Sequence, residues 1–413
     1  MDPHQWVLSL NYSRESFGTG CKVIGVTSFK DRLVPDYDTL EEINPNGVVS
    51  KNDYLKSGDV VFVRSNGNKA LVGRSLFIEK DESVAISGFC IRARLHDARL
   101  LPKYFAYFTK TDFFKRSIGH TASTSINNLN QGVLADVEII LPSVEDQSRI
   151  VEALDAIQKK ITLNNQINAE LEAMAKLIYD YWFIQFDFPD ENGKPYKSAG
   201  GKMVWCDQLN REIPDGWAPR ELHQIANITM GQSPAGSSFN SDGRGMLFYQ
   251  GSTDFGWLFP TVRQYTTEPS RLAKKGDILL SVRAPVGDMN IANSNCCIGR
   301  GLAALNSRHG FDGYLFYVMK YFKLVFDRRN TQGTTFGSIT KDDLHSLKVA
   351  YPSDPVLKDF ENLVSPMNQM IFTRASENSE LVKLRDWLLP MLMNGQVTVG
   401  DCISHASHSK ALQ

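Results

Sequence analysis

Apolar and small residues recur in alternating steps of four and three along residues 150–182. This heptad spacing predicts one long helix whose apolar seam packs against a partner helix. At about 1.5 Å per residue, the helix would be roughly 50 Å long. Charged residues such as Glu152, Lys159 and Glu172 interrupt the stretch too often for a membrane span. The seam positions are Ile150, Leu154, Ile157, Ile161, Asn164, Asn168, Leu171, Ala175, Ile178 and Trp182.

The same spacing returns near the end of the chain. Its positions are Phe360, Val364, Met367, Ile371, Arg374, Asn378, Leu381, Arg385, Leu388 and Leu392. The polar middle returns as well, because Asn164 and Asn168 correspond to Arg374 and Asn378. Two helices related by an internal repeat can pair antiparallel, and their polar middles then meet in one layer that fixes the register at some cost in stability. The alternative is two separate amphipathic helices, each packed on its own domain.

The repeat extends to the segments that precede each long helix. Residues 56–64 and 274–283 both predict a Gly-Asp turn that leads into a buried strand ending in arginine. Each strand is followed by a loop, an aromatic helix and a second loop rich in small hydroxyl residues. A short alternating strand then closes each half, at 134–142 and 344–352. This mixture of short strands and a few helices is typical of α+β domains.

The two halves differ at their start. The second half opens with Ile-Pro-Asp-Gly-Trp at 213–217 and a predicted strand near 222–228, and the first half shows no matching opening strand. The expected fold class is α+β: two mixed domains separated by two long helices that form an antiparallel coiled coil, with a pseudo-two-fold internal repeat. The predicted parts are a first domain at 1–142 that is short at its N-terminus, a spacer helix at 143–186, a connector at 187–212, a second domain at 213–352, a second spacer helix at 353–397 and a C-terminal tail at 398–413.

Composition narrows the class of protein only moderately. Among 413 residues, 45 Lys and Arg face 46 Asp and Glu, so no overall basic field indicates nucleic acid. The six cysteines form no Cys-x-x-Cys pair and accompany no paired histidines, which favours a reduced chain without a zinc site. The first residues, Met-Asp-Pro-His, lack the basic and apolar regions of a secretory signal. We therefore expect a cytoplasmic protein.

The sequence contains no motif that predicts catalysis. It has neither a phosphate-binding Walker loop nor a Gly-x-Ser-x-Gly elbow, and Gly18-Thr19-Gly20 lacks the third glycine of a dinucleotide-binding turn. The segment Asn44-Pro45-Asn46-Gly47 lacks the aromatic residue that would stack on a flipped base, so a simple turn is the better interpretation. We predict no catalytic residue, no metal site and no cofactor in this chain.

The remaining polar pattern suggests DNA binding. Arginine can bond the edge of guanine in bidentate fashion, Asn and Gln can bond adenine, and small hydroxyl residues allow close approach to phosphates. For each residue alone, the alternative is an ordinary exposed polar side chain. The candidate DNA-binding residues are Arg64, Asn66, Lys69, Thr121, Ser123, Thr124, Gln232, Gln250, Ser252, Arg283, Thr334 and Thr335.

This organisation resembles the specificity (S) subunits of type I restriction-modification systems over nearly the whole chain. The half-repeat, the Gly-Asp strand in each half and the Leu-Pro or Tyr-Pro strand end before each long helix carry the resemblance. The most specific segments are Asp-Tyr-Trp-Phe-Ile-Gln-Phe-Asp-Phe at 180–188 and the stretch from Gly-Gly-Lys-Met-Val at 200–204 to Trp217. The ending Leu-Pro-Met-Leu-Met-Asn-Gly-Gln-Val at 389–397 is similar to the last helix of that family.

The resemblance implies two target-recognition domains, each recognising half of a split site in double-stranded DNA. The helix pair would act as a ruler for the gap and would bind two methyltransferase (M) subunits, which two motor-nuclease (R) subunits join. The M subunits would use S-adenosylmethionine to methylate adenine, and the R subunits would use ATP and magnesium. The chain itself would be a non-catalytic subunit in defence against foreign DNA. Family members commonly open the first domain with a strand that is missing here.

Two other classes of protein remain as alternatives. A non-enzymatic coiled-coil scaffold would join protein partners without recognising DNA, and it would fail to protect a bipartite sequence from digestion. A self-contained methyltransferase or nuclease is disfavoured because its motifs are missing.

Overall fold

The computed structural model describes residues 17–30, 32–120, 128–331 and 338–399. It divides into two compact units: unit 1 comprises Met1–Ile161 with Glu380–Gln413, and unit 2 comprises Thr162–Ser379. This division passes through both long helices, so the domain boundaries expected from the sequence stay a prediction. In the described ranges, no helix is long and apolar enough to cross a membrane.

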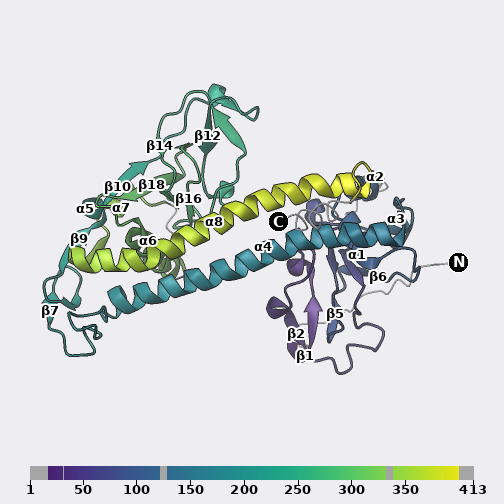
Figure 1. Ribbon diagram of the computed structural model, residues 1–413, viewed down its shortest axis with the longest axis horizontal. Coiled ribbons are helices and arrows are strands. Elements are labelled where there is room, and N and C mark those ends of the chain that lie inside the picture. Colours follow the sequence, from purple (N-terminus) through teal and green to yellow (C-terminus); the bar gives the residue numbers. More distant parts are fainter. Residues whose placement is uncertain (1–16, 31, 121–127, 332–337, 400–413) are drawn as a thin grey trace, which may run out of the picture. The chain divides into compact units, whose positions relative to one another are not determined.

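Two long helices run through the chain as continuous elements (Figure 1). Helix α4 (Val144–Tyr179) continues into a π-helical turn at Asp180–Ile184, and helix α8 spans Asp354–Met393. The start of α4 is favoured because the Ser143 hydroxyl accepts the Asp146 backbone N–H at 3.1 Å. The acidic side chains of Glu145 and Asp146 also suit the positive end of the helix dipole.

The long helices pair antiparallel within each unit. In unit 2, the ring of Trp182 near the end of α4 lies 5.8 Å from the ring of Phe360 near the start of α8. In unit 1, Arg385 Nη1 donates to Gln158 Oε1 at 3.1 Å. Residues late in one helix thus meet residues early in the other, which confirms the helix pair and the α+β class that the sequence predicts.

Unit 1 contains two three-stranded sheets, with strand orders β2-β1-β5 and β4-β3-β6. Their strands are β1 (Phe17–Ile24), β2 (Glu41–Ile43), β3 (Val60–Val63), β4 (Ser75–Phe77), β5 (Val84–Ile86) and β6 (Cys90–Ala93). Its shorter helices are α1 (Pro102–Phe108), α2 (Asp112–His120) and α3 (Gln131–Ala135). Short 3-10 turns lie at Val26–Ser28, Tyr37–Thr39 and Lys69–Leu71.

Unit 2 contains a four-stranded sheet (β10-β18-β15-β16), a five-stranded sheet (β11-β13-β12-β17-β14) and two strand pairs, β19-β9 and β7-β8. The strands are β7 (Met203–Cys206), β8 (Arg211–Pro214), β9 (Ala218–Glu221), β10 (Ala226–Met230), β11 (Phe239–Asn240), β12 (Met246–Tyr249), β13 (Gln264–Thr266), β14 (Leu272–Ala273), β15 (Ile278–Ser281), β16 (Met289–Ile291), β17 (Cys296–Ile298), β18 (Leu302–Ser307) and β19 (Lys348–Tyr351). The shorter helices are α5 (Leu222–Ile225), α6 (Asp312–Thr331) and α7 (Lys341–His345), with 3-10 turns at Gly236–Ser238 and Ser252–Asp254.

The strand pairing repeats between the two units. Strands β1 and β5 pair in parallel in unit 1, and β12 and β17 pair in parallel in unit 2. Likewise β3 lies between β4 and β6, and β15 lies between β16 and β18, all antiparallel. The internal repeat that the sequence predicts is therefore present in the backbone of both units.

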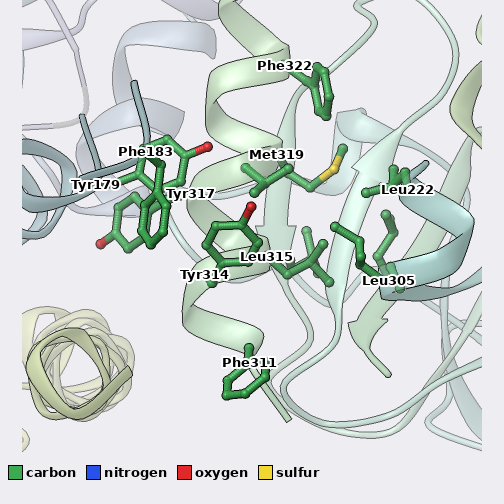
Figure 2. Close-up of a cluster of buried hydrophobic side chains, with 14 of the residues drawn as sticks. Tyr179, Phe183, Leu222, Leu305, Phe311, Tyr314, Leu315, Tyr317, Met319 and Phe322 are labelled. Carbon is green, nitrogen blue, oxygen red and sulfur yellow. The ribbon is translucent and has the colours of Figure 1, made fainter. Parts of the chain in front are cut away.

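Each unit has a hydrophobic core that includes the start of one long helix and the end of the other. In unit 1, Ile150 and Leu154 of α4 pack in one cluster with Leu389, Leu392 and Met393 of α8. The corresponding cluster of unit 2 joins Leu357, Phe360 and Val364 of α8 to Tyr179, Trp182 and Phe183 at the end of α4. In Figure 2, Tyr179 and Phe183 lie beside Tyr314 and Tyr317 of α6.

The Gly-Asp turns are structural, as their sequence indicates. Gly58 and Gly276 have φ values of 91° and 94°, a conformation that glycine adopts without strain. The Asp59 carboxylate accepts the Lys56 backbone N–H at 2.7 Å and Arg94 Nε at 2.6 Å. In unit 2, the equivalent Asp277 accepts the backbone N–H of Lys274 at 2.8 Å. Both turns thus fix the start of a fully buried central strand.

Two predicted strands differ from the structure. The closing strand forms in the second half as β19, but residues 134–142 form no strand in unit 1, where Leu134 belongs to α3 instead. In the second half, β19 is held by its antiparallel pairing with β9. The strand expected near 222–228 is instead the short helix α5 followed by β10.

The polar middle of the helix pair lies within unit 2. Asn164 Nδ2 donates to Asn378 Oδ1 and to Glu377 Oε2, both at 2.8 Å. Asn378 Nδ2 in turn donates to Asn165 Oδ1 at 2.8 Å. Arg374 instead donates from Nη1 to the Met370 carbonyl of its own helix at 3.4 Å. The structure therefore brings together Asn164 and Asn378 of the four predicted register residues.

Asn168 is fully buried, and neither atom of its amide has a hydrogen-bond partner among the described residues. A buried polar group without a partner costs about 1–3 kcal/mol, whereas an apolar group of similar shape does not. We expect Asn168→Leu to raise the free energy of unfolding by about 1–3 kcal/mol. The control Asn164→Leu should lower it, because Asn164 makes two bonds across the helix pair. Urea denaturation of both variants provides the measurement, and a less stable Asn168→Leu protein would contradict this account.

Candidate nucleic-acid interface

Several strands of unit 2 end side by side. Strands β10 and β15 both run antiparallel to β18, so Met230 pairs with Ala303 and Ser281 pairs with Leu302. Parallel strands β12 and β17 end at Tyr249 and Ile298, and β17 leads directly into β18. We call the segments that follow these four strands the unit 2 edge; they are residues 231–233, 250–252, 282–283 and 299–301.

At Gly231 and Gly301, the backbone segments of the unit 2 edge lie too close together for a side chain. A Cβ atom on Gly231 would lie 2.2 Å from the carbonyl oxygen of Gly299. A Cβ atom on Gly301 would lie 2.6 Å from the carbonyl oxygen of Gln250. Hydrogen bonds join the same segments, since Gly299 N donates to Tyr249 O at 2.8 Å and Gly301 N donates to Gln250 O at 3.1 Å. The glycines therefore let three chain segments form one closely packed surface.

Three predicted DNA-binding residues lie at this edge. Gln232 and Gln250 are exposed, and Ser252 is half-buried at the start of a 3-10 turn. Gln250 Oε1 accepts the hydroxyl of Ser233 at 3.1 Å, and Gln232 N donates to Ile298 O at 3.0 Å. The structure thus brings together side chains from β10 and β12 that are remote in sequence.

A buried carboxylate that was not among the predicted residues supports Gln250. Asp254 accepts the Gln250 backbone N–H at 3.1 Å and Arg263 Nε at 2.5 Å. Burial also raises the pKa of the Tyr249 hydroxyl directly before Gln250, so this group stays neutral beneath the edge. No local signal distinguishes Asp254 in the sequence, because its partner Arg263 is brought to it by the loop between β12 and β13.

The two arginines predicted at strand ends are not equivalent. In unit 2, Val282 N donates to Gly301 O at 2.9 Å and Ile339 N donates to Val282 O at 2.8 Å. In unit 1, these bonds are made by Arg64, whose N donates to Phe89 O at 2.7 Å and whose O accepts Leu129 N at 2.8 Å. Arg64 therefore corresponds to the buried Val282.

Arg283 corresponds instead to Ser65, since Arg283 forms an antiparallel bridge with Ser338 and Ser65 forms one with Asn128. The sequence predicts a strand ending in arginine in each half, and Arg64 directly follows β3, whereas Arg283 lies two residues after β15, so the two arginines are offset by one residue in the repeat. This offset changes the environment of the side chain, because successive side chains of an extended chain point to opposite sides. Arg283 is exposed, whereas Arg64 is half-buried.

At the edge of unit 1, residues 25–27, 64–66 and 87–89 correspond to the segments that follow β12, β15 and β17, and the described part of unit 1 has no counterpart of the segment that follows β10. Asn66 Oδ1 accepts the Asn68 backbone N–H at 2.7 Å, so its amide helps to shape the loop. Lys69 is exposed at the start of a 3-10 turn. Phe89, which was not predicted, is 59% exposed at this edge. The predicted residues Thr121, Ser123, Thr124, Thr334 and Thr335 lie outside the described residues.

The long helices carry a second kind of surface. In unit 2, Met174, Leu177 and Tyr181 of the α4 end are 50%, 67% and 38% exposed, and we call them the α4 patch. In unit 1, Leu384 and Trp387 are 43% and 56% exposed and lie with the half-buried Met391 in the α8 patch. Each patch residue directly precedes a seam position of its helix, so the two patches are equivalent in the repeat.

No cluster of three or more His, Cys, Asp or Glu side chains that could hold a metal ion occurs in the ranges that the structure describes. Lys320 of unit 2 is half-buried on α6, and burial lowers its pKa to about 8. Its ammonium group pairs with Glu172 of α4 rather than facing the unit 2 edge.

Comparison with known proteins identifies the family. The model of the type I restriction modification DNA specificity domain matches residues 9–173 and 214–358. A putative type I restriction enzyme specificity subunit, MjaX of Methanocaldococcus jannaschii, is 30% identical over 349 residues, which are 83% of this chain and 79% of the relative. The MjaIX specificity subunit of the same organism is 25% identical over 312 residues, covering 72% of this chain and 68% of the relative.

A solved structure agrees with the fold. The S subunit of a type I restriction-modification system from M. genitalium matches with a TM-score of 0.58 at 14% identity, covering 94% of this chain and 93% of that one. Together with the family match over both halves, these findings show that the chain belongs to the DNA specificity subunits of type I restriction-modification systems.

Proposed function

We propose that the two units recognise the two halves of one bipartite site in double-stranded DNA. This proposal rests on one observation: the two units share strand pairings and backbone hydrogen bonds but carry different polar side chains at the matching positions. Two backbone hydrogen bonds recur, since Ser87 N donates to Ile24 O as Gly299 N donates to Tyr249 O, and Arg64 N donates to Phe89 O as Val282 N donates to Gly301 O. At these matched places, Arg283 stands where unit 1 has Ser65, and Gln250 stands where unit 1 has Gly25. Equal frames with unequal polar groups suit recognition of two different short sequences.

The chain supplies specificity, and partner subunits supply the chemistry. Membership of the family of specificity subunits supports this role, and nothing in the comparisons supports a scaffold that ignores DNA. In the proposed complex, the methyltransferase subunits use S-adenosylmethionine, and the motor-nuclease subunits use ATP and magnesium. The compartment that fits such a complex is the cytoplasm.

Two methyltransferase subunits bind the α4 and α8 patches in this proposal, and two motor-nuclease subunits then join them. Exposed apolar clusters of this kind on helices are typical of protein-binding surfaces. The repeat provides one such cluster in each unit, which supports two copies of the same partner. An apolar helix face also suits a partner helix laid along it.

The helix pair sets the length of the gap between the two half-sites. Helices α4 and α8 each continue without a break through the point where unit 1 and unit 2 are divided. The number of residues in a continuous helix fixes the distance between its two ends, at about 1.5 Å per residue. The bonded residues Asn164 and Asn378 oppose sliding of one helix along the other, because sliding would separate them.

Charged substitutions in the two patches test the docking. We expect Leu177→Glu and Trp387→Glu each to reduce the bound methyltransferase subunits from two to one, because a buried unpaired carboxylate is costly at an apolar interface. The double variant should bind none. Native mass spectrometry of the co-purified complexes gives the stoichiometry. Leu324→Glu is the matched control, since Leu324 is 45% exposed on α6 and belongs to neither patch. Two subunits bound to the double variant would contradict the placement.

Lengthening both helices tests the ruler and the bipartite site together. Insertion of seven helical residues after Asn164 and before Asn378 keeps the heptad phase and adds about 10 Å. That length corresponds to about three base pairs at 3.4 Å each. We expect the methylated motif to keep both half-sequences and to gain about three base pairs in its gap. An unchanged gap in an active complex would exclude the ruler.

A further inference from the structure

Arg300 is an exposed cation at the unit 2 edge that was not among the predicted DNA-binding residues. Its side chain is exposed, and it stands between Gly299 and Gly301 in the turn from β17 to β18. Its guanidinium group makes no hydrogen bond or ion pair within the part of the chain that the structure describes. The side chain is therefore available for a ligand.

The backbone that carries Arg300 is held on both sides. Gly299 N and Gly301 N donate to the carbonyl oxygens of Tyr249 and Gln250, at 2.8 and 3.1 Å. The Arg300 backbone N–H lies 3.4 Å from the Ser233 hydroxyl, which donates to Gln250 Oε1 at 3.1 Å. Because neither glycine has room for a Cβ atom, the turn cannot shift toward β12. A fixed backbone lowers the entropic cost of placing a long side chain on a base.

The surroundings of Arg300 suit a base edge. Gln232 and Gln250 are exposed on the neighbouring segments, and residues 231–233, 250–252 and 299–301 contain no Asp or Glu that would neutralise the guanidinium. The nearby carboxylate of Asp254 is buried and bound to Arg263. A planar guanidinium fork matches the O6 and N7 acceptors of guanine, which is the commonest specific contact between a side chain and a base.

Unit 1 has no counterpart of this side chain. The parallel pair β1-β5 has the register of β12-β17, with Ile24 opposite Ile86 where unit 2 has Tyr249 opposite Ile298. Two residues further on, Gly88 occupies the position of Arg300. The exposed Phe89 follows it where unit 2 has Gly301. The two edges therefore differ most in chemistry at this turn.

We propose that Arg300 recognises a guanine in the half-site bound by unit 2. This inference rests on the proposed function, because it assigns one base contact within it. It adds a specificity-determining residue that the sequence pattern alone does not distinguish from an ordinary turn arginine.

The test is a genome-wide map of methylated adenines for complexes that contain the wild-type chain, Arg300→Ala or Arg300→Lys. We expect Arg300→Ala to lose the preference for guanine at one position of one half-motif, by about 5- to 150-fold, with the other half and the gap unchanged. Arg300→Lys keeps the charge but not the fork, so it should retain only part of the preference. Arg244→Ala is the control, because the exposed Arg244 precedes β12 at its opposite end.

Three results separate the possibilities. An unchanged motif with uniformly lower methylation for Arg300→Ala would overturn the inference, because it would identify a phosphate contact. An unchanged motif at an unchanged level would also overturn it. Circular dichroism of each purified variant establishes that its fold is intact. If the wild-type complex itself yields no bipartite motif, the proposed function fails, and this outcome is distinct from failure of the Arg300 contact.

Discussion

The largest hydrophobic core of each unit is completed by the end of a long helix that begins in the other half of the repeat. Unit 1 buries Leu389, Leu392 and Met393 from the end of α8, and unit 2 buries Tyr179 and Trp182 from the end of α4. Full burial of one such side chain is worth about 1.5–3 kcal/mol. The cost of closing the long connection grows only slowly with its length. The long helices are therefore parts of the two cores as well as links between segments.

In this arrangement, the residues that fix the fold are different from those at the edges and in the exposed patches. The cores and the Gly-Asp turns fix the backbone of each edge, so the edges can differ in side chains without loss of the fold. Ser65 and Arg283, or Gly25 and Gln250, occupy equivalent places on equal frames. The outer faces of the helices remain free of this packing and carry the exposed apolar patches. In the proposed function, specificity, partner binding and the length of the gap therefore depend on different sets of residues.

The sequence predicts the features whose cause is local or periodic. The heptad spacing indicates the helix pair because a helix presents every third and fourth residue on one face. The internal repeat predicts that the polar middles of the helices meet, and Asn164 and Asn378 do so, but Arg374 bonds within its own helix and Asn168 has no hydrogen-bond partner among the described residues. The closing strand at 134–142 fails because a strand depends on a partner that the local pattern does not contain. The offset between Arg64 and Arg283 is already present in the sequence, because Arg64 lies five residues after Asp59 and Arg283 lies six residues after Asp277. Arg300 is missed because its place depends on contacts that are remote in sequence, and Gly-Arg-Gly looks like any turn until β17 is paired with β12.

The most direct test of this account is a map of methylated adenines made by the chain together with its methyltransferase subunit, in a host that lacks other adenine methyltransferases. The account predicts one split motif with two different fixed halves and a constant gap, because two unlike edges are joined by helices of fixed length. A motif with only one fixed half, or no methylation by an intact complex, would contradict the claim that both units recognise DNA.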